Sequence, residues 1–158
     1  MHMSQRGKIL LAKWEGIKHK VYKDVGGLDT IGVGHLLTQK ERFSKKIIIK
    51  GLAIDYKLGL TNEQVMDLLS QDLKVFERVV SKAVQVSITQ NQFDSLVSFA
   101  FNVGVNAFRK STLLKILNKK KYEEVPDQFR RWVKAGSKTI QGLVNRRENE
   151  INLWIYNV

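Results

Sequence analysis

The chain has 158 residues, 43% of them hydrophobic, which suits a single folded domain with its own core and excludes an intrinsically disordered chain. It contains no cysteine, which excludes disulfides, thiol chemistry and cysteine-ligated metal sites. The 27 basic and 15 acidic residues give a formal net charge of +12, which favours a polyanionic partner such as nucleic acid, an anionic membrane or an anionic cell wall.

The first 60 residues combine one short helix with a β-rich segment. Residues 6–15 carry apolar side chains at the spacing of one helical face, and Glu15 falls at the end of that predicted helix. Residues 20–36 are rich in Gly, Thr, Ile and Val and predict a small β-hairpin or meander. The two apolar runs at residues 47–49 and 52–54 either add an edge strand or pack a loop.

The remainder of the chain has a helical pattern. Thr61 with Gln64, and Thr89 with Gln92, have the spacing of a capping box, which marks a helix start. Apolar stripes at helical spacing predict helices over residues 62–82, 90–104, 111–119, 122–134 and 142–156, and we assign these stripes to core packing.

These elements predict an α+β fold within a single domain of residues 1–158. A small β-rich N-terminal lobe would cover about residues 16–60. A larger helical lobe would comprise about residues 61–158 together with the helix at 6–15. A cleft between two lobes is a natural site for an extended ligand.

Three polar residues near a glycine-rich stretch are the candidate catalytic residues. Glu15 lies in a mostly apolar segment, Asp24 follows nine residues later, and Thr30 follows six residues after that. Glycoside hydrolysis requires two carboxyl groups in different surroundings, because one must donate a proton and the other must be ionised. Apolar neighbours would desolvate Glu15 and keep a proton available, whereas Asp24 in a polar turn would stay ionised.

Each of these residues also has an ordinary structural explanation. Glu15 could simply end a helix and pair with an arginine, although a glutamate there lies unfavourably against the helix dipole. Asp24 could be a turn residue, and Thr30 could reflect strand propensity alone. Asp29 is a competing carboxylate, but it lies between the strings Tyr22-Lys23-Asp24 and Thr30-Ile31-Gly32-Val33-Gly34-His35 and belongs to neither.

The strings around these residues resemble the active-site segment of phage-type lysozymes, the endolysin muramidases of glycoside hydrolase family 24. The resemblance rests on Glu15-Gly16, Tyr22-Lys23-Asp24, Gly27 and Thr30-Ile31-Gly32-Val33-Gly34-His35, and it continues in residues 92–104, 111–114 and 142–148. These motifs occur in the family's order from about residue 8 to the C-terminus. The resemblance implies a lysozyme-like fold in which a long helix, about residues 62–82, joins the two lobes.

The resemblance also implies roles for individual residues. Glu15 would be the general acid, while Asp24 and Thr30 would position water and stabilise the transition state; Asp24 as the middle residue favours inversion. Substrate-binding positions would be Leu36, Phe101, Ser111 and Gln128.

Asp72 stands on the apolar stripe of its helix, so it either lies at the solvent-exposed edge of the stripe or finds a partner. The resemblance favours a structural ion pair with His35. One of Arg146 and Arg147 is expected to approach Glu15 or the cleft.

The implied function is hydrolysis of the β-1,4 bond between N-acetylmuramic acid and N-acetylglucosamine in bacterial peptidoglycan, causing host cell lysis. We expect no cofactor, no metal, no nucleic-acid partner, no stable membrane insertion and a monomeric protein. The early apolar run at residues 9–12 is too short for a signal peptide or signal anchor. The protein is therefore expected in the host bacterial cytoplasm until it is released to the cell wall.

Two other function classes compete with this interpretation. The charge would suit a nucleic-acid-binding helical module, but no recognisable binding motif supports one. A wall-binding protein on a lysozyme scaffold that has lost activity is the other rival, and intact Glu15, Asp24 and Thr30 argue against it.

Overall fold

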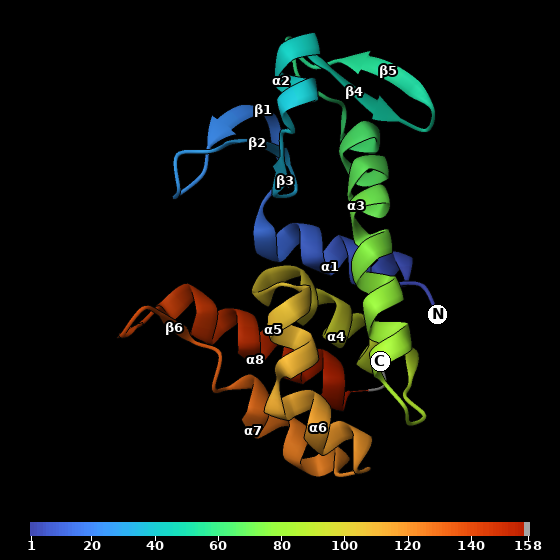
Figure 1. The fold of residues 1–158 in the computed structure, drawn as a ribbon, viewed down its shortest axis with the longest axis vertical. Helices are drawn as coiled ribbons and strands as arrows, with labels where there is room; N and C mark the ends of the chain where they lie inside the picture. The colour runs from blue at the N-terminus through green and yellow to red at the C-terminus, as the bar shows by residue number, and fades with distance from the viewer. Residues whose placement is uncertain (157–158) are drawn as a thin grey trace. The chain divides into compact units, whose positions relative to one another are not determined.

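The structure, a computed structural model, describes residues 1–156 (Figure 1). These residues form two compact units. The β-containing unit is Lys8–Lys74, and the helical unit is Met1–Gly7 together with the chain from Val75 onwards. The combination of helices with short antiparallel strands confirms the predicted α+β class.

The β-containing unit holds a three-stranded antiparallel sheet and a separate two-stranded hairpin. The sheet has the order β1-β2-β3, so the predicted meander is confirmed. The two apolar runs form the hairpin, because Ile49 pairs with Leu52 across a tight turn. The elements are α1 (Gln5–Glu15), which begins in the helical unit, and β1 (Lys18–Lys23), β2 (Asp29–Gly32), β3 (His35–Leu36), α2 (Gln39–Ser44), β4 (Lys46–Ile49) and β5 (Leu52–Asp55).

The first half of α3 (Asn62–Ala83) groups with the strands, which differs from the expected lobe boundary near residue 60. The first half of α3 groups with the strands because it packs closely against β2 of the sheet. A Cβ atom added to Gly32 of β2 would lie 3.7 Å from side-chain atoms of both Val65 and Leu68. Most of α1 groups with the strands as well.

The helical unit contains the second half of α3 and a series of shorter helices. They are α4 (Gln90–Val103), α5 (Val105–Lys110), α6 (Thr112–Asn118), a 3-10 helix (Tyr122–Glu124), α7 (Val125–Phe129) and α8 (Gln141–Ile155). A small antiparallel hairpin of β6 (Lys134–Ala135) and β7 (Lys138–Thr139) precedes α8.

The predicted helix over residues 122–134 is wrong in its second half. The helical backbone ends at Phe129, and the chain then enters the exposed β6–β7 hairpin. Gly136 has a φ of 64°, a left-handed conformation that glycine adopts readily and that allows the tight turn.

The core of the helical unit is built around α4, in which every residue from Phe93 to Ala100 is buried. The ring of Phe99 makes edge contacts with Phe129 and Trp132, at centroid distances of 5.2 and 5.4 Å. These aromatic residues therefore pack the core of this unit. Over residues 1–156, no helix has the length and apolarity required to cross a membrane.

Candidate active site

Glu15 is the last residue of α1, at the point where the chain leaves the helix for β1. Gly16 ends the helix: its φ is 84°, and its N–H donates to the carbonyl oxygen of Ala12 at 2.9 Å. Leu11 and Ala12 in the preceding turn are buried, and Glu15 itself is half-buried. Buried apolar residues therefore precede Glu15 in α1, whereas Ile17 after it is exposed.

Asp24 organises the turn between β1 and β2. Its Oδ1 accepts hydrogen bonds from the N–H groups of Gly26 and Leu28, both at 2.8 Å. Gly27 completes the turn with a φ of 78°. Oδ1 of Asp24 therefore stabilises the turn, which is the ordinary structural role expected of an aspartate at this position. Within residues 1–156, no protein hydrogen bond occupies Oδ2, so the second carboxylate oxygen can still accept one from water or substrate.

Thr30 lies in the central strand of the small sheet. It pairs with Tyr22 of β1 on one side and with Leu36 of β3 on the other. Its side chain is buried, and its hydroxyl donates to the carbonyl oxygen of Leu28 at 2.9 Å. Because the proton is used in this bond, the Thr30 oxygen is left to accept a hydrogen bond.

Tyr22 is a fourth residue of this group, and it is not among the residues predicted from the sequence. Burial and the negative charges of Glu15 and Asp24 raise the pKa of the Tyr22 phenol. Tyr22 therefore lies within electrostatic range of both carboxyl groups and also pairs with Thr30. Its place in the string Tyr22-Lys23-Asp24 is the signal that could have identified it.

Asp29, the competing carboxylate, is held by an ion pair. Its Oδ1 lies 2.6 Å from Nζ of Lys23, which pairs with it across β1 and β2. The hydrogen bond from Lys23 lowers the pKa of Asp29. This carboxylate is therefore engaged in holding the two strands together.

The structure brings His35 and Asp72 together and adds a second carboxylate. Nδ1 of His35 lies 2.8 Å from Oδ2 of Asp72, and Nε2 lies 3.0 Å from Oε1 of Glu41. Glu41 also completes a capping box with Thr38 at the start of α2. The Thr38–Glu41 spacing is visible in the sequence and could have predicted this helix.

The two carboxylates outweigh the effect of burial on His35. Burial alone would lower the pKa of His35, but Asp72 and Glu41 raise it to about 9. A raised folded-state pKa stabilises the fold fully below the unfolded value of 6.5, and this contribution is lost as pH rises through about 9.

We therefore expect the free energy of unfolding to fall between about pH 6.5 and pH 9, by up to roughly 3 kcal/mol. In the variant His35→Asn this decline should be much shallower, because the titrating group is gone. Urea unfolding of both proteins at several pH values measures the slope. Parallel pH profiles for the two proteins would show that the His35 cluster does not couple protonation to folding.

The residues predicted to bind substrate lie in both units. Leu36 is half-exposed on β3 of the β-containing unit, whereas the other three belong to the helical unit. Phe101 packs edge-on against Phe76 at 5.3 Å. Ser111 caps α6 through its hydroxyl, which accepts from the N–H of Leu114 at 3.1 Å, and Gln128 is buried in α7. Contact of these residues with substrate stays a prediction.

Arg146 and Arg147 both approach Glu150 in the helical unit. Nε of Arg146 lies 2.9 Å from Oε1 of Glu150, and Nε of Arg147 lies 3.3 Å from Oε2. Ser98 donates to Glu150 at 2.8 Å. Burial raises the pKa of Glu150, while the guanidinium groups of Arg147 and Arg146 act in the opposite direction. The predicted approach of one arginine to Glu15 or the cleft stays a prediction.

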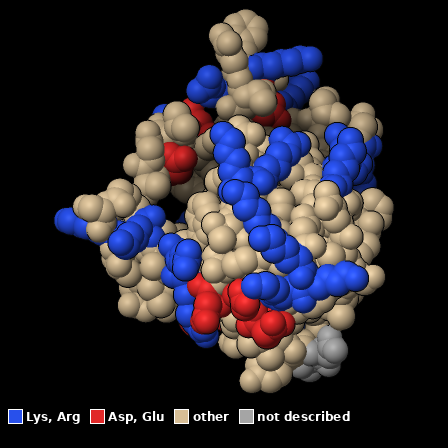
Figure 2. Space-filling view, turned by 60° about the horizontal axis from the view of Figure 1, so that its bottom comes forward, with Lys and Arg blue, Asp and Glu red and all other residues tan. Residues whose placement is uncertain are grey.

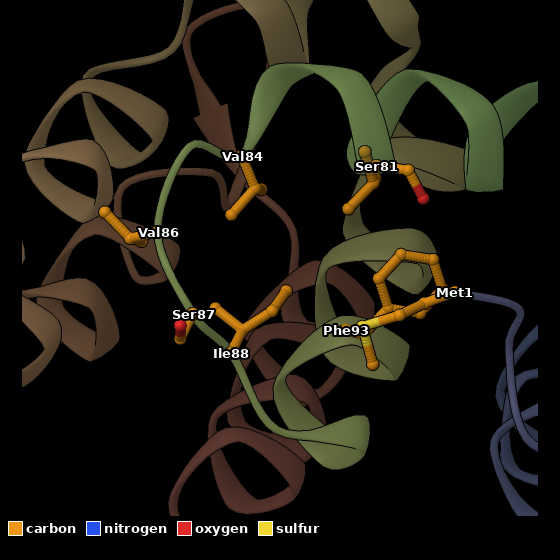
Figure 3. A pocket seen from close by; sticks show the side chains of 8 residues that line it. Met1, Ser81, Val84, Val86, Ser87, Ile88 and Phe93 are labelled. Atoms are coloured by element: carbon orange, nitrogen blue, oxygen red, sulfur yellow. The ribbon is translucent and has the colours of Figure 1, made fainter.

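One hollow in the helical unit has no carboxyl or histidine side chain in its lining (Figure 3). It has a volume of about 310 Å³ and lies between the end of α3, the following loop and α4. Its lining is Met1, Val80, Ser81, Val84, Val86, Ser87, Ile88 and Phe93. In the part of the chain that the structure describes, no three His, Asp or Glu side chains are arranged to hold a metal ion.

Most of the chain matches a known protein family. Residues 12–150 match the family model described as phage lysozyme. The chain belongs to the phage lysozyme family. This match includes all three predicted catalytic residues as well as His35 and Asp72.

Members of the phage lysozyme family are similar to this chain over nearly its whole length. An endolysin of Bacillus phage PZA is 42% identical over 152 residues, which cover 95% of this chain and 54% of the relative. An endolysin of Salmonella phage P22 is 38% identical, with coverage of 98% and 99%. The crystal structure of a mutant P22 lysozyme has 36% identity, 99% coverage of both chains and a TM-score of 0.83.

The fold is therefore that of a phage lysozyme, as predicted. The chain spans about half the length of the Bacillus phage endolysins that it matches and nearly the full length of the P22 endolysin.

Proposed function

We propose that this chain is an endolysin muramidase, which hydrolyses the β-1,4 bond between N-acetylmuramic acid and N-acetylglucosamine in bacterial peptidoglycan and thereby lyses the host cell. The grouping of Glu15, Asp24 and Thr30 in one unit, with Tyr22 in the electric field of both carboxyl groups, carries the proposal. Membership of the phage lysozyme family supports the same activity.

Glu15 acts as the general acid. An alkoxide is a poor leaving group, so the glycosidic oxygen must receive a proton as its bond to the sugar breaks. Glu15 follows the buried turn of α1 and is half-buried, so its carboxyl group is partly removed from water.

Asp24 and Thr30 act on the water that attacks the sugar. The Asp24 Oδ2 atom can accept a proton from that water, since the turn engages only Oδ1. The Thr30 oxygen can accept a second hydrogen bond and fix the direction of the attack. The carboxylate of Asp24 also stabilises positive charge that develops on the sugar ring. This division of roles predicts inversion at the anomeric carbon.

The partner in this proposal is peptidoglycan, on which the protein acts as a monomer without nucleic acid or stable membrane insertion. Before lysis it accumulates in the host cytoplasm and is then released to the wall. The acid–base mechanism uses side chains of this chain alone and requires no cofactor.

Digestion of purified peptidoglycan tests the proposal. The new reducing ends are reduced with borohydride, and the resulting sugar alcohols are separated and identified. A muramidase gives muramitol, because it cleaves after N-acetylmuramic acid. Glucosaminitol would indicate a glucosaminidase instead. Binding of the wall without new reducing ends would indicate an inactive wall-binding protein.

A further inference from the structure

More than half of the net positive charge comes from one continuous segment that is poor in acidic residues. Residues 78–122 contain eight basic residues and a single acidic one, Asp94. Asp94 is buried and binds Ser4 and Gln90, so it contributes little negative charge to the surface. The eight basic residues are Arg78, Lys82, Arg109, Lys110, Lys115, Lys119, Lys120 and Lys121. More than half of the net charge therefore comes from this segment.

The same segment forms an open groove on the helical unit. The groove has a volume of about 470 Å³ and lies where the end of α3 meets α5 and α6. Its lining is Val79, Lys82, Ala83, Gln85, Arg109, Leu114, Lys115 and Asn118. Figure 2 shows a row of Lys and Arg side chains across the face in view.

The groove has an apolar floor and a cationic rim. Val79 and Leu114 are 7% and 6% exposed and supply the floor. The three cationic side chains of the rim, Lys82, Arg109 and Lys115, are exposed. Among residues 1–156, none of these three forms an ion pair or a side-chain hydrogen bond, so all three can bind a ligand.

Asn118 fixes the shape of the groove. Its Oδ1 accepts from the N–H of Gln85 at 2.8 Å, and its Nδ2 donates to the carbonyl oxygen of Ala83 at 3.0 Å. These two bonds tie α6 to the end of α3, so the three cations are held by elements linked to one another. A preformed cationic site loses less entropy when it binds a ligand.

We propose that this groove binds a phosphodiester-linked polyol chain of the bacterial wall, separately from the glycan that is cleaved. The phosphates would contact Lys82, Arg109 and Lys115, and the carbon atoms of the polyol would cover Val79 and Leu114. The inference rests on the proposed function, because a peptidoglycan hydrolase works beside such wall polymers. The groove would retain the enzyme on the wall between cleavage events.

The lining argues against the two other polyanions. Proteins that bind single-stranded nucleic acid without sequence preference stack the bases on aromatic side chains, and no aromatic residue lines this groove. Interfacial binding to a membrane requires an exposed apolar face, whereas Val79 and Leu114 are recessed and buried.

The test measures binding in the Glu15→Gln background, so that it does not depend on catalysis. One variant carries Lys82→Gln, Arg109→Gln and Lys115→Gln. A matched control carries Lys40→Gln, Lys46→Gln and Lys57→Gln, which remove the same charge from exposed positions of the β-containing unit. The probes are fluorescent poly(glycerol phosphate), a single-stranded DNA oligonucleotide and phosphatidylglycerol vesicles, each at about 0.1 M salt, where the Debye length is about 10 Å.

We expect the groove variant to bind poly(glycerol phosphate) about tenfold or more weakly than the parent. The control variant should lose no more than about threefold, from the reduced long-range attraction alone. With Glu15 restored, the groove variant should cleave polymer-free glycan fragments at the parent's rate.

Equal losses in the two variants would overturn the proposal, because net charge would then explain the binding. If the groove variant lost binding to DNA or vesicles but kept its binding to poly(glycerol phosphate), the proposal would be overturned in favour of that other partner. The proposal would also be overturned if the parent showed no measurable binding to poly(glycerol phosphate). If the muramidase activity is absent but the groove binds the polymer selectively, only the proposed function fails.

Discussion

Replacing Glu15 with Gln is expected to reduce the rate of peptidoglycan hydrolysis by about 100-fold to 10,000-fold, the usual contribution of a general acid. The substitution keeps the size of the side chain but removes the proton that the leaving oxygen needs. Glu15 ends α1 and is half-buried, so the fold should persist. Release of reducing ends measures the rate, and thermal unfolding checks the fold.

Asp29→Asn is the matched control for this experiment. Asp29 belongs to the same unit and also carries a carboxylate, but Lys23 holds it at 2.6 Å in a structural ion pair. Its replacement should leave most of the activity. If Glu15→Gln retains a tenth or more of the parent's rate, Glu15 is not the general acid.

The largest expected effect on stability comes from Glu150→Ala. Glu150 is fully buried and receives Arg146, Arg147 and Ser98 around its carboxylate. Removing it leaves two buried cations without this partner, which typically costs about 3–5 kcal/mol. The melting temperature of a protein of this size should then fall by roughly 10 °C.

Glu148→Ala provides the comparison on the same helix. Glu148 lies two residues earlier and pairs with Arg130 at 2.9 Å, but both side chains are nearly half-exposed. An exposed pair of this kind contributes about 1 kcal/mol or less. Alanine is favourable at both helix positions, so helix propensity does not distinguish the two variants. Similar losses of stability in the two variants would mean that burial of the ion pair does not determine the cost of removing it.

Much of the fold follows from local sequence signals. Helices α3 and α4 begin after Thr61 and Thr89, where the capping-box spacing predicts a start. The six-residue helices α2 and α5 escaped prediction, because so short a segment shows little periodicity. The β6–β7 hairpin was missed because its strands are exposed and have no apolar alternation.

The candidate site likewise contains residues that local sequence signals identify and residues that only the fold brings together. The strings around Glu15, Asp24 and Thr30 are local in sequence, so the order of residues along the chain is enough to select them. The contact of His35 with Asp72 joins residues 37 positions apart and was expected only through the family resemblance. Tyr22 and Glu41 were missed because their roles depend on which side chains the fold brings near them. The basic groove likewise assembles residues from three helices.

The most direct test of the proposed chemistry is the configuration of the first product. In an inverting glycosidase the two carboxyl groups lie about 6.5–9.5 Å apart, which leaves room for a water, whereas about 5–5.5 Å is typical of retention. The proposed placement of an attacking water by Asp24 and Thr30 predicts the wider spacing for Glu15 and Asp24. Proton NMR of a fresh digest should therefore show the α-anomer of N-acetylmuramic acid first. Initial appearance of the β-anomer would contradict the account and would make Asp24 a nucleophile.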